Sequence, residues 1–346
     1  MIARRTLLGA LPASTLAATL ATPALAQGSG GPIQPSAPFG APAIGPRFPD
    51  RPLRRVIPFA PGGGTDAFAR RIATRLGQEL GQNVVPDNRA GASGAIGMAD
   101  VLRARPDGYT LVFAGASTHS LYPLVVARPQ YDPLVDFSPV ALVGANSVCV
   151  IARSDVATSL TGLVALAKAR PGQLRFANPG TGTYVHMVGE YLKHEVRADW
   201  LPVPYRGNGP AMVDLLAGQI DAATDTVVTS LPHHREGKVK MLAVCSRERS
   251  PLAPEVPTVA EALGLPGFEA ALWSMLAVRT GTPPELVARL HDATLKALAD
   301  PAFQRDLIEA GIEPSPPATP DQVADFVRAE TEKWRPIVAA TGVKLE

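Results

Sequence analysis

The feature that most constrains the fold is a regular alternation, from about residue 53 onward, of short apolar runs with segments of helical periodicity. Residues 55–59 form the first apolar run and end in a glycine-rich turn. A predicted helix follows, and one of its faces carries an apolar residue at every fourth position: Phe68, Ile72, Leu76 and Leu80. This alternation is typical of parallel sheets covered by helices on both faces, so the sequence predicts an α/β fold.

The same pattern continues to the end of the chain. Further strands are expected at 84–85, 109–114, 148–152, 174–177, 201–205, 220–224, 240–245 and 270–278. Helices are expected near 94–104, over 160–169 after the N-cap Ser159, up to residues 194, 216 and 236, and over 283–299, 301–310 and 320–340. Prolines open the last three helices, where the missing N–H has no intrahelical partner to lose.

These last three helices have no sheet of their own and must pack on one formed earlier. We therefore expect the chain to cross into a second domain near residue 147 and to return near residue 271. The predicted domains are 53–147 together with 271–346, and 148–270. About 300 residues exceed one ordinary core, and two crossings between domains form a hinge.

The first 26 residues are typical of an export signal. Arg4 and Arg5 give a positive start, residues 7–20 are apolar, and Ala24-Leu25-Ala26 resembles a cleavage site. The paired arginines leave both the twin-arginine and the general secretory route open, and either predicts a periplasmic protein. Residues 27–52 are rich in Pro, Gly and Ser and are expected to form a flexible arm.

The charge balance argues against a nucleic-acid partner. The chain has 33 basic and 31 acidic residues, and loss of Arg4 and Arg5 with the signal leaves 31 of each. No basic run with interleaved aromatic residues is present. Cys149 and Cys245 lie in apolar segments, where a disulfide and two buried thiols both remain possible.

Glycine-rich turns follow predicted strands in both halves of the chain. Ligands of open parallel sheets bind at the carboxyl ends of strands, where helix N-termini offer free N–H groups. The turn at 61–66 offers three glycines and the Thr65 hydroxyl, and 180–183 repeats this combination; 115–120 and 225–226 are further candidates. Such turns facing each other across a hinge would hold an anion with neutral donors, although glycines also serve turns for purely structural reasons.

Several motifs, in order and spacing, resemble the Bug family, the extracytoplasmic solute receptors of tripartite tricarboxylate transporters. They cover nearly the whole chain after residue 57 and are accompanied by His186, Glu261 and Trp273. The motifs are PFAPGGGTD at 58–66, NRAGASG at 88–94, PDGYTL at 106–111, DFSPV at 136–140, GTGT at 180–183, VPYRG at 203–207, DLLAGQID at 214–221 and VPT at 256–258.

The resemblance implies a two-domain fold like that of periplasmic binding proteins, with two doubly wound sheets joined by two crossover strands and a ligand cleft between them. It implies a monomer that binds a small organic acid through backbone N–H groups, hydroxyls and ordered waters, for membrane transporter subunits or a sensor. With the turns described above, the candidate ligand contacts are Phe59, Gly62, Gly63, Thr65, Asp66, Ser117, Thr118, Gly180, Gly182, Thr183, His186, Tyr205, Asp225, Thr226 and Trp273.

The chain departs from the family pattern at three places. Ala90 stands where the family often has proline, Tyr122-Pro123 replaces an Asn-Pro pair, and Thr183 replaces a common serine but keeps the hydroxyl. Tyr122 would narrow or line the pocket. The ligand is therefore open between the usual small aliphatic diacid and an aromatic acid.

No catalytic residue, metal site or cofactor is predicted. The stretch 91–95 lacks the last glycine of a nucleophile elbow, and the adjacent His233 and His234 would point apart on a helix, unlike metal ligands. Two alternatives to a receptor remain: a hydrolase or isomerase that uses His186 and Asp225, and a structural or sensing partner that has lost ligand binding.

Overall fold

The computed structural model describes residues 48–345. The predicted export signal at 1–26 and residues 27–47 of the predicted arm lie outside the described residues. No helix within the described part of the chain combines the length and the apolarity needed to cross a membrane.

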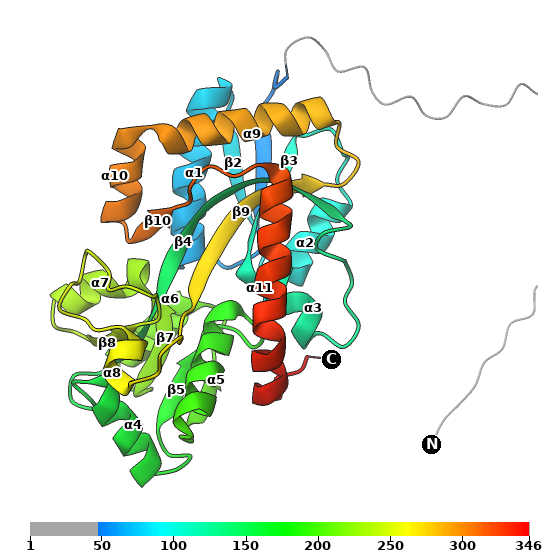
Figure 1. Ribbon diagram of the computed structural model, residues 1–346. Helices are drawn as coiled ribbons and strands as arrows, with labels where there is room; N and C mark the ends of the chain where they lie inside the picture. The colour runs from blue at the N-terminus through cyan, green and yellow to red at the C-terminus, as the bar shows by residue number, and fades with distance from the viewer. Residues whose placement is uncertain (1–47, 346) are drawn as a thin grey trace, which may run out of the picture. The chain divides into compact units, whose positions relative to one another are not determined.

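Ten strands of the described chain belong to one curved sheet (Figure 1). Their bounds are β1 Leu53–Ile57, β2 Val84–Asn88, β3 Thr110–Gly115, β4 Phe137–Ala152, β5 Arg175–Asn178, β6 Leu201–Pro204, β7 Ala222–Thr226, β8 Lys240–Val244, β9 Ala271–Arg279 and β10 Ile312–Pro314. The order along the sheet is β2-β1-β3-β9-β4-β7-β5-β6, and β8 and β10 also pair with β4.

The predicted helices are present, with ends within two residues of those expected. They are α1 Gly64–Leu80, α2 Ala95–Leu102, α4 Leu160–Ala169, α5 Tyr184–Val196, α6 Asn208–Leu216, α7 Val227–Arg235, α9 Pro284–Ala299, α10 Pro301–Glu309 and α11 Pro320–Thr341. Two short helices, α3 Tyr122–Val125 and α8 Val259–Leu263, were not predicted. A 3-10 turn, η1 (Ala92–Gly94), and a π-helix, η2 (Ala116–Leu121), complete the set. The Ser159 side chain accepts a hydrogen bond from the Gly162 N–H, which confirms the predicted cap of α4.

Strand β4 connects the two halves of the sheet. From Phe137 to Ser147 it pairs with β9, and the last residue pair is Ser147 opposite Ala271. From Val148, which lies opposite Thr226, it pairs with β7. The trios β1–β2–β3 and β5–β6–β7 contain only parallel pairs, whereas β4 and β9 run antiparallel to each other. The chain leaves the first half of the sheet along β4 and returns to it along β9. The two strands therefore run in opposite directions beside each other, which makes the sheet mixed.

The strand predicted to begin at residue 148 in fact begins at Phe137. Pro139 and Gly144 resemble turn residues, but both lie inside β4. The register against β9 shifts once after Pro139 and once before Gly144, so irregular pairing accommodates a residue without an N–H and a residue with φ +148°.

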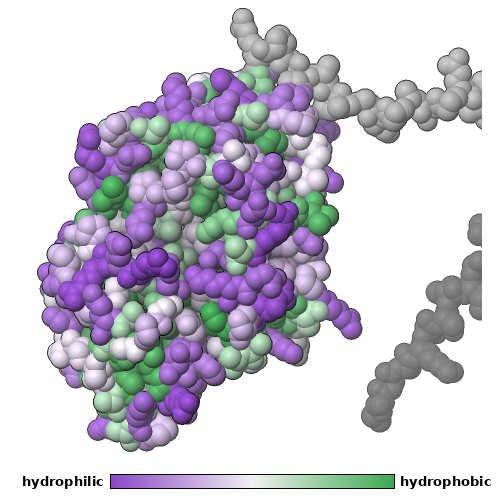
Figure 2. Space-filling view, in the orientation of Figure 1, coloured by the Kyte–Doolittle hydropathy of each residue, from purple (hydrophilic) through white to green (hydrophobic). Residues whose placement is uncertain are grey.

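Helices cover both faces of the sheet. On one face α1, α9 and α10 pack over the first trio, where Phe68 meets Phe113 edge to face at 5.2 Å. On the other face α11 lies along both halves (Figure 1): Phe326 packs against Trp273 of β9, and Trp334 packs against Tyr184 of α5. Hydrophilic side chains are spread over the face seen in Figure 2, with hydrophobic ones in small groups between them.

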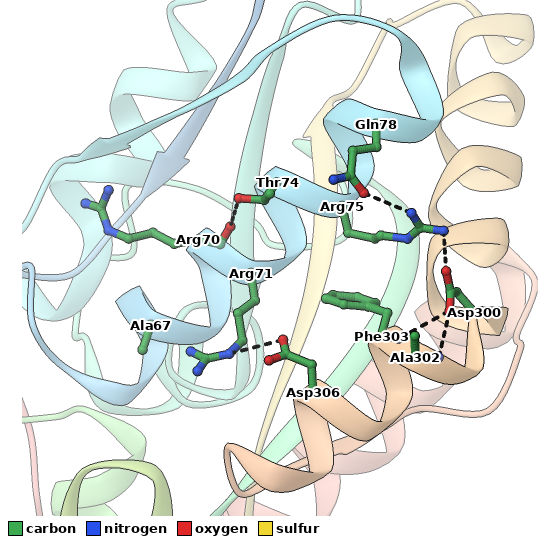
Figure 3. A pocket seen from close by; sticks show the side chains of 10 residues that line it. All are labelled: Ala67, Arg70, Arg71, Thr74, Arg75, Gln78, Asp300, Ala302, Phe303 and Asp306. Carbon is green, nitrogen blue, oxygen red and sulfur yellow. Dashed lines mark hydrogen bonds and ion pairs between the residues drawn. The ribbon is translucent and has the colours of Figure 1, made fainter.

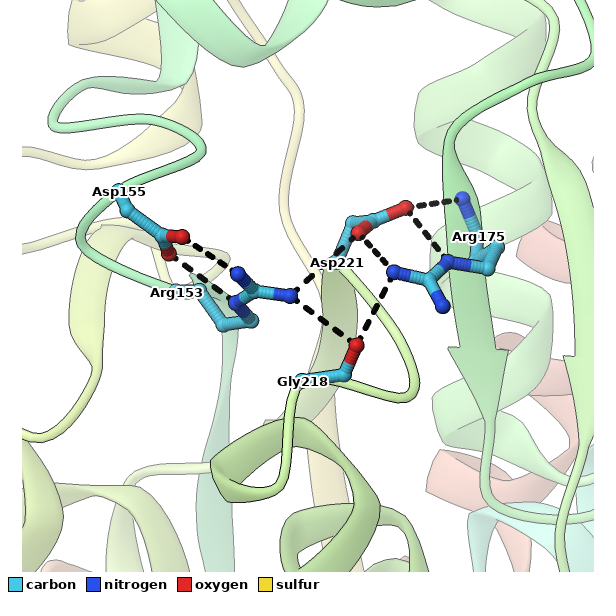
Figure 4. Close-up of polar contacts among 5 residues, drawn as sticks. All are labelled: Arg153, Asp155, Arg175, Gly218 and Asp221. Atoms are coloured by element: carbon cyan, nitrogen blue, oxygen red, sulfur yellow. Dashed lines mark hydrogen bonds and ion pairs between the residues drawn. The ribbon is translucent and has the colours of Figure 1, made fainter.

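A polar cluster ties together the strand ends in the second half of the sheet (Figure 4). Asp221 accepts hydrogen bonds from the Arg175 side chain, at 2.6 Å and 3.1 Å, and from the Arg175 N–H. Arg153 and Arg175 both donate to the Gly218 carbonyl, and Arg153 also pairs with Asp155. Burial raises the pKa of Asp221, but the Arg175 hydrogen bonds outweigh it, and the pKa is lowered. This cluster fixes the DLLAGQID turn that leads into β7.

Both cysteines are free thiols. Cys149 lies in β4 and Cys245 directly after β8, and both side chains are buried. Burial raises the pKa of Cys245 to about 12. Of the disulfide and the two buried thiols that the sequence left open, the structure thus favours the buried thiols.

Arg55 on β1 is a buried cation. Its side chain is fully buried, its three guanidinium nitrogens make no hydrogen bond with any described residue, and its carbon Cζ lies 5.4 Å from the centre of the Phe113 ring. Burial, and then the charge of Arg70, lower the pKa of Arg55 to about 9, against the opposing effect of Asp66. A buried charge without hydrogen bonds destabilises the folded state.

We therefore expect Arg55→Leu to raise the free energy of unfolding by about 1–4 kcal/mol, because an apolar side chain at this position needs no hydrogen bonds. Urea denaturation at pH 7 measures the change. The neighbouring Arg54 is a matched control, since it pairs with Asp87 at 2.6 Å and with Asp100 at 2.5 Å, and Arg54→Leu should lower stability. A loss of stability in Arg55→Leu would contradict this account.

Candidate functional site

A cavity of about 900 Å³ lies at the carboxyl ends of strands from both halves of the sheet. This is the place where open α/β sheets bind ligands. The turn after β1 and the stretch 90–96 line one side, and the turns after β5 and β6 line another. Single residues complete the wall: Ser117, Tyr122, Val126, Arg128, Gln130, Val185, Thr226, Leu272 and Leu345.

Eight of the candidate contacts line this cavity, and they come from both halves of the chain: Phe59, Gly63, Thr65, Ser117, Gly180, Thr183, Tyr205 and Thr226. The turns at 62–66 and 180–183 thus converge on one space. Two hydrogen bonds hold the second turn in place: the Ser93 hydroxyl donates to the Thr181 carbonyl at 2.5 Å, and the Tyr184 N–H donates to the Ser117 hydroxyl at 2.9 Å.

Of the other candidates, Gly62 is exposed and does not line the cavity, and the rest lie behind the wall; Asp66 is the clearest example. Its carboxylate accepts hydrogen bonds from the Gly62 N–H, from Asn88 and from Arg70, at 2.9–3.0 Å. Burial raises the pKa of Asp66, but these three donors outweigh it and the pKa is lowered. In this structure the carboxylate therefore stays ionised and fixes the turn that carries Gly63 and Thr65.

His186 holds the second turn in the same manner. Its Nδ1 accepts a hydrogen bond from the Gly182 N–H at 3.0 Å, so the ring is neutral with its proton on Nε2. Thr183 caps α5, with its hydroxyl 2.7 Å from the Gly180 carbonyl oxygen. Burial lowers the pKa of His186 to about 4. The Gly182 N–H is therefore engaged with His186, and neither residue is part of the cavity wall.

Asp225 is fully engaged as well. Its carboxylate accepts hydrogen bonds from the Thr226 N–H at 2.7 Å, from the Thr229 and Ser230 hydroxyls, and from the Asn208 side chain. Burial raises the pKa of Asp225 even though these four donors oppose it. Asp225 therefore positions Asn208 and Thr226, which line the cavity.

Thr118 and Trp273 also lie behind the wall. The Thr118 hydroxyl accepts a hydrogen bond from the Gly115 N–H at 3.1 Å, and the Trp273 ring is buried against Phe326. Tyr122, singled out as a departure from the family pattern, does line the cavity. Its ring stacks on Tyr131 at 4.3 Å, and its hydroxyl accepts a hydrogen bond from the Gln130 N–H.

Two lining residues that sequence reasoning did not select are arginines. Arg128 follows α3 and Arg206 follows β6; both are exposed, and neither forms an ion pair with another described residue. No Asp or Glu is among the described residues that line the cavity. Arg206 belongs to the VPYRG motif and could have been selected from it, whereas no signal marks Arg128. The cavity therefore combines neutral donors with two unpaired cations.

A second cavity, of about 520 Å³, lies between α1 and α10 (Figure 3). Its arginines are paired: Arg75 lies 2.6 Å from Asp300, and Arg71 lies 3.4 Å from Asp306. It contains no glycine turn. We take the larger cavity as the functional site, because it gathers free donors at the carboxyl ends of strands.

This fold and this cavity define the class of two-domain solute-binding proteins. Residues 68–343 match the TctC family, described as the tripartite tricarboxylate transporter family receptor. The chain belongs to this family. It is 37% identical to protein BugT of Bordetella pertussis over 314 residues, which cover 89% of this chain and 94% of BugT. The resemblance to Bug proteins is thereby confirmed.

Solved structures agree with this assignment. The periplasmic binding protein BugD is 34% identical with a TM-score of 0.82, over 86% of this chain and 100% of BugD. An R. palustris protein solved with adipate is 33% identical with a TM-score of 0.82, over 85% and 98% of the two chains. MatC from Rhodopseudomonas palustris, with bound malate, is 34% identical with a TM-score of 0.79, over 84% and 100%. The predicted two-domain fold is thus confirmed.

The neutral state of His186 makes stability depend on pH. Its pKa of about 4 lies below the usual 6.5 of an unfolded chain, so the unfolded state binds more protons between these values. We expect this contribution to stability to be complete above pH 6.5 and to be lost as the pH falls toward 4, by up to about 1.4 kcal/mol per pH unit.

Urea denaturation of the wild type and of His186→Gln between pH 4 and 7 tests this expectation. Buried His119, whose pKa burial lowers to about 3, titrates in both proteins and cancels in the comparison. The wild type should lose stability more steeply than the variant. Parallel pH profiles would show that the imidazole does not stay neutral in the folded state.

Proposed function

We propose that the protein captures a small organic carboxylate outside the cytoplasm and passes it unchanged to membrane transporter subunits or to a sensor. The observation that carries this proposal is the charge of the cavity wall: Arg128 and Arg206 are present, and no acidic side chain is found among the described lining residues. The two positive charges attract anions, and no lining carboxylate repels them. The relatives solved with adipate and malate support the same class of ligand.

The proposed binding mechanism relies on donors that are already in place. The turn 63–65 opens α1 and presents N–H groups with the partial positive charge of a helix start. The turn 180–183 opens α5 and adds the partial positive charge of a second helix start. In this structure the N–H groups of Gly180, Gly182 and Thr183 donate to Asn178, to His186 and to the Gly180 carbonyl. Ser117 and Thr226, which carry hydroxyls, also line the cavity, whereas the Tyr205 hydroxyl donates to Asp214 at 2.7 Å and is left as an acceptor. A carboxylate held between these turns would interact with both halves of the protein at once, with ordered water filling the remaining gaps.

We further propose that the halves are domains 53–147 with 271–346, and 148–270, and that they close around the ligand. In support, β4 changes partners between Ser147 and Val148, and Ser147 is opposite Ala271, where β9 begins. The hydrogen bonds from Ser93 to Thr181 and from Tyr184 to Ser117 would then join the two domains in the closed state.

The enzyme alternative receives less support from the site. His186 and Asp225, its proposed catalytic pair, lie behind the wall; the imidazole Nδ1 is engaged by Gly182, and four donors hold the carboxylate. A general base must reach the proton that it removes. We therefore propose a receptor rather than a catalyst, acting as a monomer in the periplasm after export by the predicted signal.

Titration calorimetry with malate, succinate, adipate and benzoate tests the function directly. At least one acid should bind, and mass spectrometry after incubation should recover it unchanged. Thermal unfolding gives a second readout, since ligand at a hundred times its Kd adds about 2.7 kcal/mol of stability. Absence of binding by every acid, or formation of a product, would overturn the receptor proposal.

For the cavity charge, we expect Arg206→Gln to weaken the binding of the best acid about tenfold, or about 1.4 kcal/mol, and to reduce the salt dependence of Kd. Calorimetry at about 20 mM NaCl, where charges are weakly screened, and at about 200 mM NaCl, where they are strongly screened, measures both effects. Arg105, which is exposed and outside the cavity wall, provides the control variant Arg105→Gln. Equal Kd values for the two variants would exclude Arg206 from ligand binding.

For the second turn, we expect Gly182→Val to abolish binding and leave the fold intact. Gly182 has φ +76°, which a β-branched residue rarely adopts, and a Cβ there would lie 2.5 Å from Leu345 Cδ1, so the turn or the Leu345 side chain in the cavity wall must shift. Gly237→Val is a matched control, because Gly237 has φ +71° and open space around it. Circular dichroism monitors the fold and calorimetry the binding. Normal binding by Gly182→Val would remove this turn from the site.

A further inference from the structure

After α11 the chain returns to the cavity, over residues 342–345. Helix α11 ends at Thr341. Its C-cap Gly342, with φ +68°, turns the chain, and Leu345 then pairs with the loop after α3. The Leu345 N–H donates to the Val125 carbonyl at 2.7 Å, and its carbonyl accepts from the Ala127 N–H at 3.1 Å. Two backbone hydrogen bonds therefore fix the main chain of Leu345 beside the loop after α3.

That side chain lies against the second glycine turn. Leu345 lines the cavity, is half-buried, and has Cδ1 and Cγ 2.5 Å and 3.2 Å from the point where a Cβ on Gly182 would stand. The Ser93 hydroxyl is 3.3 Å from the same point. Leu345 thus fills the space between the turn 180–183 and the stretch 91–94.

This part of the wall is mostly apolar, since the nearby Ser93 hydroxyl donates its hydrogen to the Thr181 carbonyl. Leu345 and its bridge partner Val126 both line the cavity, and neither side chain can donate a hydrogen bond. A hydroxyl or charged group of a ligand placed against them would lose hydration without a new partner. A hydrocarbon portion fits there, and the branched leucine limits how large it can be.

We propose that Leu345 is a specificity-determining residue: the tail after α11, residues 342–345, forms an apolar part of the cavity wall and limits the size of the ligand's carbon body beside the turn 180–183. This inference rests on the proposed function, since it concerns which carboxylates the same cavity accepts. The selected class is carboxylates whose carbon body next to the turn is unsubstituted hydrocarbon.

The test compares matched acids that differ in size: adipate with the longer suberate, and benzoate with the wider 1-naphthoate. In Leu345→Ala, the Kd of the larger acid relative to the smaller should fall about tenfold in at least one pair, because added methylenes in an apolar pocket change affinity by this order. Leu345→Phe should raise the same ratio. A purely structural role would weaken both members of a pair equally and leave the ratio unchanged.

Lys344→Ala is the matched control, because Lys344 is the exposed neighbour of Leu345 and is not part of the cavity wall. Its ratios should stay within twofold of the wild type, and the melting temperatures of all variants confirm folding. If the wild type binds an acid from either pair and both Leu345 variants keep wild-type ratios, the tail has no selective role. If the wild type binds malate or succinate but none of these four acids, the inference about Leu345 fails and the proposed function stands. If it binds none of the acids named here or above, the proposed function itself fails.

Discussion

The structure depends on the pairing of β4 with β9. These two strands run antiparallel through the middle of the sheet, and β4 then continues without a break into pairing with β7 and β8. Each backbone N–H and C=O in such buried strands needs a partner, so the crossing must be made by strands rather than by loops. This constraint brings the carboxyl ends of two parallel trios toward one space.

The buried ionisable side chains near the cavity position its turns, whereas other groups form the cavity wall. Asp66, His186 and Asp225 are buried and engaged with the turns, and they hold Gly62, Gly182 and Asn208 in place. The wall itself carries N–H groups, hydroxyls and two arginines. A buried carboxylate facing an anion would raise the energy of the bound state, whereas the same carboxylate behind the turn stabilises its donors.

Much of the fold could be predicted because the signals are local. The N-cap Ser159, the prolines that open α9, α10 and α11, and the fourfold apolar spacing of α1 each act within one or two turns of chain. The start of β4 was missed, since Pro139 and Gly144 are tolerated only through register shifts against β9, a strand about 130 residues away in sequence. In the site, the glycine turns were recognised, but Arg128 and Leu345 carry no local signal.

The sequence by itself determined the α/β class, the position of most of the longer helices and strands and the two glycine turns, because periodicity, capping and positive-φ requirements are properties of short segments. The short elements α3, α8 and β10 were not predicted. The tertiary structure alone decided which polar residues face the cavity and which stand behind it. It also decided that the chain's last leucine reaches Gly182, because that contact depends on where α11 packs and on backbone pairing with the loop after α3.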